Sequence, residues 1–192
     1  MFWSKASGTL ITGAMLSMAL SGAFPSRSKA ANYTSEEVIA LVNEYREGEG
    51  LNVLDTDDKL MKAAMEKARD MLEKGYWNHY GPNGETPWQF IKGEGYQYSV
   101  AGENLAKGFN DENNMMNAWL NSPAHKANIA KAEYTDIGVA VIDGVLEGKN
   151  VTLVVQVFGK EKEVKKEETT PITPNNIENS FKNFLERLGF RF

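Results

Sequence analysis

Residues 118–129 read AWLNSPAHKANI, and two helical segments meet inside this stretch. Segment 110–121 has a polar start and apolar residues within it, which predicts a helix. Ser122 and Pro123 then begin a second helical turn, because serine caps helices and proline is accepted at the first helical position. His125 follows one turn later. A histidine in this place either ties the turn to neighbouring chain or takes part in a site.

Polar segments also occur earlier in the chain, at 78–84 (NHYGPNG, with His79) and at 101–106 (AGENLA, with Glu103). The chain has 2 histidines, and both lie in these polar stretches. Histidine is the commonest metal ligand and the usual general base near neutral pH. Small apolar neighbours around Glu103 predict a buried carboxylate, which needs a partner or takes up a proton. His79, Glu103 and His125 are therefore the candidate site residues, for catalysis, metal binding or structural hydrogen bonding.

The fold prediction follows from the apolar periodicity on either side of these segments. Helices are expected at 34–48, at 57–74 and from Thr86-Pro87 onward. Strands are expected at 99–106, 137–142 and 151–158, the last two joined as a hairpin by a loop through 143–148. Both hairpin strands are nearly all apolar, so the sheet should be covered on both faces. This pattern predicts an α/β domain with α-β-α layers.

The start of the chain has the features of an export signal. Lys5 is followed by an uncharged stretch at 8–24, and Ser28-Lys29-Ala30 offers small residues at both cleavage positions. Residues 1–30 are therefore predicted to be a secretory signal peptide, with an uncleaved membrane anchor as the alternative. The expected location is secreted, extracellular or associated with the cell envelope.

Charge and cysteine content limit the partners and the means of stabilisation. The chain carries 26 Asp and Glu against 21 Lys and Arg, a formal net charge of −5, and the predicted signal peptide contains no acid. An acidic surface argues against nucleic acid, or an anionic membrane, as the main partner. The chain contains 0 cysteines, so no disulfide framework supports the fold. Residues 31–159 suit one domain held together by its core.

The last part of the chain changes character twice. Residues 160–176 are charged and then rich in Thr and Pro, which predicts a linker. Residues 177–192 carry apolar side chains at roughly helical spacing, which predicts a short amphipathic helix. We expect this helix to dock on its own domain, with a membrane surface or another partner as alternatives.

Four sequence motifs, in their order along the chain, resemble those of the CAP superfamily, also called the SCP domain, in its bacterial secreted form. These segments are YWNHYGPNGETPW (76–88), AGENLAKG (101–108), AWLNSPAHKANI (118–129) and YTDIGVAV (134–141). The resemblance extends from about Ser35 to Phe158. It implies a three-layer α-β-α sandwich around a small three-stranded antiparallel sheet.

The resemblance also implies a cleft built from two histidines and two glutamates. His79 fits the first histidine of this set, and Glu103 fits the first glutamate. The second glutamate usually lies just after the tryptophan-containing helix, where this chain has Asn121 and Ser122. His125 is the simplest choice for the second histidine, although its loop context differs from that of plant and animal relatives. This departure weakens the case for a complete set and for a hydrolytic mechanism.

Three functions fit these observations. The favoured one is a non-enzymatic extracellular module that binds a lipid, a glycan or a protein. The second is a metal-dependent hydrolase in which His79 and His125 hold Zn²⁺ or another divalent cation and Glu103 activates water. Two histidines fall short of the three protein ligands usual for catalytic zinc. In the third, the trio is a structural hydrogen-bond network and the protein acts through its C-terminal tail.

Overall fold

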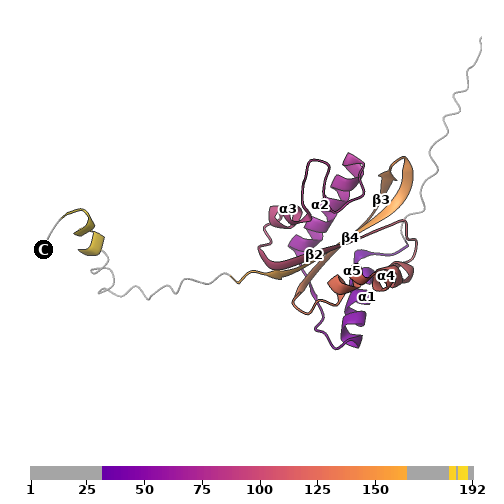
Figure 1. Cartoon of the computed structure of the whole chain (residues 1–192), viewed down its shortest axis with the longest axis horizontal. Coiled ribbons are helices and arrows are strands. Elements are labelled where there is room, and N and C mark those ends of the chain that lie inside the picture. Colours follow the sequence, from indigo (N-terminus) through magenta and orange to yellow (C-terminus); the bar gives the residue numbers. More distant parts are fainter. Residues whose placement is uncertain (1–31, 164–181, 185, 190–192) are drawn as a thin grey trace, which may run out of the picture.

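The computed structural model describes residues 32–163, 182–184 and 186–189 (Figure 1). The predicted signal peptide and most of the predicted linker and tail lie outside these residues. No helix among the described residues has the length and apolar character needed to cross a membrane.

The helices form where the sequence predicts them, and their ends carry the expected caps. They are α1 (Ser35–Gly48), α2 (Asp58–Lys74), α3 (Pro87–Gly93), α4 (Glu112–Asn121) and α5 (Pro123–Ile129). Thr34 and Glu37 form a reciprocal capping box at the start of α1, which satisfies two free backbone amides. Asp57 caps α2, and Gly75 ends it with a left-handed φ of 67°. Ser122 precedes α5 without a side-chain capping bond, so Pro123 is the feature that starts this helix.

The sheet is mixed and has four strands, in the order β1-β3-β4-β2. The strands are β1 (Asp55–Thr56), β2 (Tyr98–Lys107), β3 (Asp136–Leu146) and β4 (Lys149–Glu161). β2, β3 and β4 pair antiparallel, whereas β1 pairs parallel to β3. The expectation of a three-stranded antiparallel sheet is therefore corrected. β1 escapes sequence analysis because two residues are too few to show a period of two.

The hairpin between β3 and β4 is confirmed, but its loop is much shorter than 143–148. The strands pair as far as Leu146 and Lys149, which leaves Glu147 and Gly148 as the turn. Their φ angles are 51° and 75°, and a tight hairpin turn needs positive φ at both central residues. Gly144 suggested a loop, yet it lies within β3, where an added Cβ would meet the side chain of Leu72.

Helices cover both faces of the sheet, as the apolar hairpin strands predict (Figure 1). Along β4, Val154 and Phe158 belong to the core that includes α1, α4 and α5. Leu153, Val155 and Val157 belong to the core that includes α2 and α3. This alternation follows from the period of two of a strand. The described domain is therefore an α/β layered fold consistent with the α-β-α sandwich of the resemblance.

One buried cation connects α1 to the chain that follows α5. Arg46 is fully buried, and its guanidinium donates hydrogen bonds to the carbonyls of Asn52, Ile129 and Lys131 at 2.8, 2.8 and 2.9 Å. Burial lowers its pKa. Its backbone partners offset the desolvation that a buried charge would otherwise suffer. Arg46 thus ties α1 to the segment at the end of α5 that contains Ile129 and Lys131.

Candidate functional site

Glu103 lies on β2 and forms the buried end of a contact with His79. Its side chain is only 2% exposed, and its Oε1 lies 2.5 Å from His79 Nδ1. The second carboxylate oxygen, Oε2, is buried and has no hydrogen-bond partner among the described residues. Burial raises the pKa of this carboxyl, while the hydrogen bond to His79 and the charge of Lys67 act in the opposite direction. The site therefore contains one satisfied and one unsatisfied buried acceptor.

His79 lies in the loop between α2 and α3, and its side chain is 48% exposed. The loop is held from below by Lys67 of α2, whose ammonium donates to the carbonyls of Asn78 and His79 at 3.1 and 2.8 Å. A further bond joins the same ammonium to the hydroxyl of Tyr76 at 3.0 Å. These bonds set the position from which the imidazole reaches Glu103.

Lys67 is a part of the site that sequence reasoning missed. It is 1% exposed, and burial lowers its pKa although the charge of Glu103 raises it. A signal was present in the sequence, because Lys67 lies seven residues after Leu60 and four after Ala63, both in the apolar stripe of α2. A lysine inside such a stripe needs buried acceptors, and here the His79 loop supplies them.

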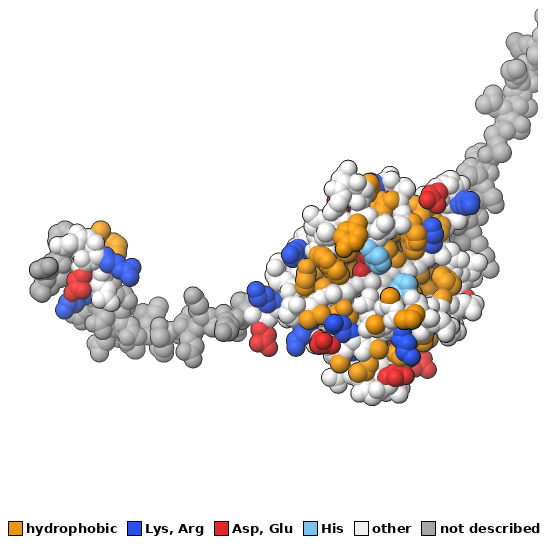
Figure 2. Space-filling view, viewed as in Figure 1, with side chains coloured by type: hydrophobic (Ala, Val, Ile, Leu, Met, Phe, Trp, Pro, Cys, Tyr) orange, Lys and Arg blue, Asp and Glu red, His pale blue; other side chains and the backbone are white. Residues whose placement is uncertain are grey.

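His125 lies on α5, beside the cleft but not in its lining. Both histidines of the chain, pale blue in Figure 2, appear on one face of the domain. Burial lowers the pKa of His125, and the positive charge of His79 lowers it further. The structure therefore joins His79 to Glu103 by a hydrogen bond and places His125 near His79, with no hydrogen bond between the His125 side chain and either of these side chains.

An amide network fixes the backbone around Glu103. Asn104 is fully buried, and its Nδ2 donates to Gln156 Oε1 at 3.0 Å and to the carbonyl of His125 at 3.2 Å. Asn128 of α5 donates to Asn104 Oδ1 at 2.9 Å and to the carbonyl of Glu103 at 3.0 Å. Asn104 thus ties β2 to β4 and to α5 through its side-chain amide. The network links β2, β4 and α5 at the cleft.

The cleft above Glu103 has a volume of about 400 Å³. Aromatic rings and polar groups share its walls, which are formed by His79, Tyr80, Pro87, Trp88, Ala101, Gly102, Glu103, Asn128, Lys131 and Tyr134. Tyr80 is 57% exposed, so its ring is open to a ligand. Gly102 is required here, because a Cβ would overlap the hydroxyl of Tyr134. The described lining contains no serine, threonine or cysteine.

The described residues contain no group of three or more His, Cys, Asp or Glu side chains arranged to hold a metal ion. His79, Glu103 and His125 therefore do not make a three-ligand set, which a catalytic zinc site usually requires. His79 and His125 as a weaker two-histidine site, for Zn²⁺ or another divalent cation, stay a prediction.

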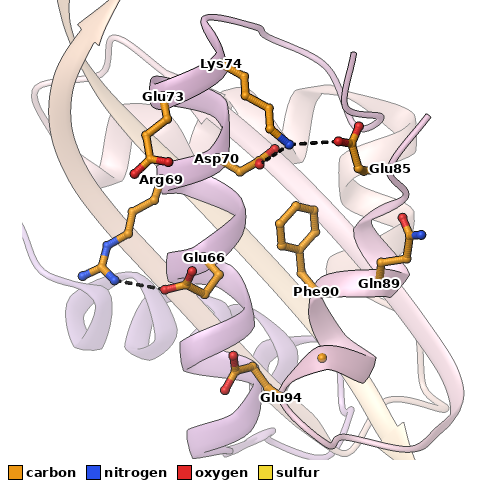
Figure 3. A pocket seen from close by; sticks show the side chains of 10 residues that line it. Glu66, Arg69, Asp70, Glu73, Lys74, Glu85, Gln89, Phe90 and Glu94 are labelled. Atoms are coloured by element: carbon orange, nitrogen blue, oxygen red, sulfur yellow. Dashed lines mark hydrogen bonds and ion pairs between the residues drawn. The ribbon is translucent and has the colours of Figure 1, made fainter. Parts of the chain in front are cut away.

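A larger hollow of about 520 Å³ lies between α2 and α3 (Figure 3). Its walls are mostly charged, and Lys74 forms ion pairs there with Asp70 and Glu85 at 2.7 and 2.9 Å. None of the predicted site residues lines it.

Sequence and structure together define a member of one family. Residues 39–158 match the CAP family, the Cysteine-rich secretory protein family, and this match covers more than half of the chain. The chain belongs to the CAP family.

Its relatives include proteins of bacterial surfaces. The uncharacterized protein YkwD of Bacillus subtilis is 37% identical over 108 residues, which is 56% of this chain and 42% of that protein. The chain thus spans less than half the length of this relative. An outer surface protein of Borrelia burgdorferi is 32% identical, with a TM-score of 0.60 over 66% of this chain and 92% of that one. An extracellular protein of Bacillus anthracis with an SCP domain is 25% identical, with a TM-score of 0.58 over 66% and 40%.

Proposed function

We propose that this chain is an exported CAP domain that binds an extracellular ligand in the cleft of His79 and Glu103. The observation that carries the proposal is the open cleft lined by both residues, in which the His79 side chain is 48% exposed and its Nδ1 is held by the buried Glu103 carboxylate. With Nδ1 engaged, the imidazole keeps its other nitrogen, Nε2, to exchange a hydrogen bond with a ligand.

The walls of the cleft favour a glycan as this ligand. An acyl chain binds best in an enclosed apolar cavity, whereas this cleft is open and combines Glu103, Asn128 and Lys131 with aromatic rings. Tyr80 and Trp88 offer flat apolar faces, and a sugar ring presents both a C–H face and hydroxyl donors. The alternative ligand is a partner protein that inserts a hydroxyl-bearing side chain into the cleft.

Binding without chemistry also fits the composition of the described cleft. Hydrolysis of a glycan canonically uses two carboxylates, and the described lining contains one, Glu103. The described lining also contains no serine, threonine or cysteine nucleophile, and the described residues offer no three-ligand metal site. The hydrogen bond between His79 and Glu103 gives the pair a fixed orientation, which suits recognition. Export is supported by the predicted signal peptide and by the surface and extracellular relatives.

The test is an array of neutral, acidic and amino-sugar oligosaccharides, followed by calorimetry on any glycan that binds. We expect Glu103→Gln and His79→Ala to weaken binding at least about tenfold, which corresponds to one lost hydrogen bond of roughly 1.4 kcal/mol. Glu94→Gln, in the separate hollow of Figure 3, is the matched control and should bind as wild type. Equal affinity of all four proteins, or no binding of any glycan, would contradict the proposal.

A further inference from the structure

An apolar groove separate from the cleft runs between α1 and α4, with a volume of about 440 Å³. Its apolar residues are Leu41, Tyr45, Met116 and Leu120, and its polar residues include Glu44, Glu49, Asn113 and Asn117. The hydroxyl of Tyr45 is buried and has no hydrogen-bond partner among the described residues. A groove that combines apolar and acidic side chains can accept an amphipathic helix that carries positive charge.

The C-terminal tail carries a helix face that suits such a groove. The amide of Leu188 donates to the carbonyl of Phe184 at 3.3 Å, so these two residues lie one helical turn apart. Their side chains are 57% and 59% exposed, and they share one face of the helix. In the sequence, Lys182 and Arg187 lie beside this apolar pair. Glu186 lies between the two apolar anchors, so the described tail residues carry two positive charges and one negative charge.

We propose that the described part of the tail, residues 182–184 and 186–189, docks in the α1/α4 groove of its own domain. Phe184 and Leu188 would contact the apolar residues of the groove, and Lys182 and Arg187 would lie near Glu44 and Glu49. The described tail residues have a net positive charge, whereas Glu44 and Glu49 give the groove a net negative charge, and this difference favours the pairing over one between like charges.

The hollow of Figure 3 suits the tail less well. Phe90 is the one large apolar side chain among its described wall residues, and much of its charge is already paired. Arg69 pairs with Glu66 at 3.0 Å, and Lys74 bridges Asp70 and Glu85. An apolar helix face placed there would cover ion pairs and gain little apolar burial.

The chain between the domain and the tail is long enough for docking within one molecule. Roughly 20 residues separate Glu163 from Phe184, and they span up to about 65 Å when extended. The radius of gyration expected for a domain of this size is about 14 Å, so the tail reaches every face. Tethering gives an effective concentration of about 1 mM, which lets a weak interface stay occupied. Docking also supplies the surface that a helix this short needs in order to stay folded.

Disulfide cross-linking in the full chain tests the proposal. The protein has 0 cysteines, so any disulfide that forms within a chain must join the two introduced cysteines. The test pair is Asn117→Cys with Asn183→Cys, on the groove edge and beside Phe184. The control pair is Glu73→Cys with Asn183→Cys, at the hollow of Figure 3. Copper phenanthroline is the oxidant, and the protein is kept dilute.

We expect the test pair to cross-link within one chain at least about tenfold faster than the control pair, because docking raises the local thiol concentration. Phe184→Ser with Leu188→Ser should remove this difference, and both residues are exposed, so the domain keeps its fold. Equal rates for the two pairs would overturn the proposal. Cross-links found only between chains would assign the groove to a second copy and overturn docking within one chain. Sedimentation of the chain with phosphatidylglycerol vesicles, without a cross-link between Asn117→Cys and Asn183→Cys, would assign the tail to a membrane surface and would also overturn the proposal.

Discussion

His79 Nδ1 lies 2.5 Å from Glu103 Oε1, although the two residues are 24 positions apart in the chain. The imidazole is about half exposed and the carboxylate is buried, so the pair connects solvent to the interior of the domain. This contact, and not a set of three side chains, is the centre of the candidate site.

The first prediction concerns the charge on Glu103. Burial raises its pKa from the ordinary value of 4.5, so the folded chain holds this proton more tightly than the unfolded chain. The stability from this group is therefore fully present below the ordinary pKa of 4.5 and is lost as the pH rises through the raised folded pKa. Urea unfolding of wild type should show this loss, whereas Glu103→Gln should show less of it.

Glu103→Ala serves as the companion variant. It removes the partner of His79 and leaves a cavity, so it should cost about 1–3 kcal/mol more than Glu103→Gln at pH 7. Identical unfolding midpoints for both variants and wild type would show that Glu103 has no structural role, and would leave its part in binding as the only one.

Lys67 is predicted to position the His79 loop. Lys67→Met keeps the length of the side chain but removes the donor to the carbonyls of Asn78 and His79. We expect a loss of about 2–4 kcal/mol in urea unfolding, because several buried acceptors lose a charged partner. The NMR shift of the His79 imidazole should also move, which a purely local loss of stability would not cause. Lys67→Arg is the control, and an unchanged His79 signal in Lys67→Met would contradict the positioning role.

Gly138 is predicted to be the tightest point between α2 and the sheet. An added Cβ there would overlap the backbone of Leu60 and Met61, which cannot move as a flexible side chain does. Gly138→Ala should therefore destabilise the domain by about 3 kcal/mol. Gly48→Ala is the matched control, because a Cβ at this helical position meets nothing within 4 Å. It should be neutral or stabilise by about 0.4–1 kcal/mol, and equal midpoints for the two variants would refute the packing argument.

Metal binding by the histidines is predicted to be weak and dependent on pH. Burial lowers the pKa of His125, so this imidazole stays neutral and able to bind a metal to a lower pH than an exposed one. Calorimetric titration with Zn²⁺ should show heat at neutral pH that fades below about pH 6 as imidazoles protonate. His79→Ala with His125→Ala removes every histidine from the chain, so equal heats for this variant and wild type would count against the site.

The tail is predicted to add little to the stability of the domain. Truncation after Glu163 leaves the strand ladder complete, so the domain should stay folded, and its thermal midpoint should fall only by the small contribution of the docked tail. Truncation after Gly159 removes Lys160 and Glu161, which pair with β2, and should cost about 1–2 kcal/mol. Aggregation of the longer truncated chain, ending at Glu163, would show that the tail belongs to the core.

Several features of the fold could be read from local patterns. The Thr34 and Asp57 caps, the proline starts of α3 and α5, and the apolar hairpin strands all act over a few residues, so the sequence predicts them directly. Where local signals were misleading, a tertiary contact explains the outcome. Gly144 suggested a loop, but it lies inside β3, where the side chain of Leu72 fills the space that a Cβ would need.

The sequence by itself determined the family, the helices, the hairpin and the short list of candidate residues, because these depend on motifs, periodicity and capping along the chain. Tertiary structure decided which candidates meet: Glu103 contacts His79, and His125 lies beside them on the same face. It also brought Lys67 beneath the His79 loop and added β1 to the edge of the sheet. The physical reason is that strand register and helix packing join residues far apart in the chain, and local patterns do not encode those distances.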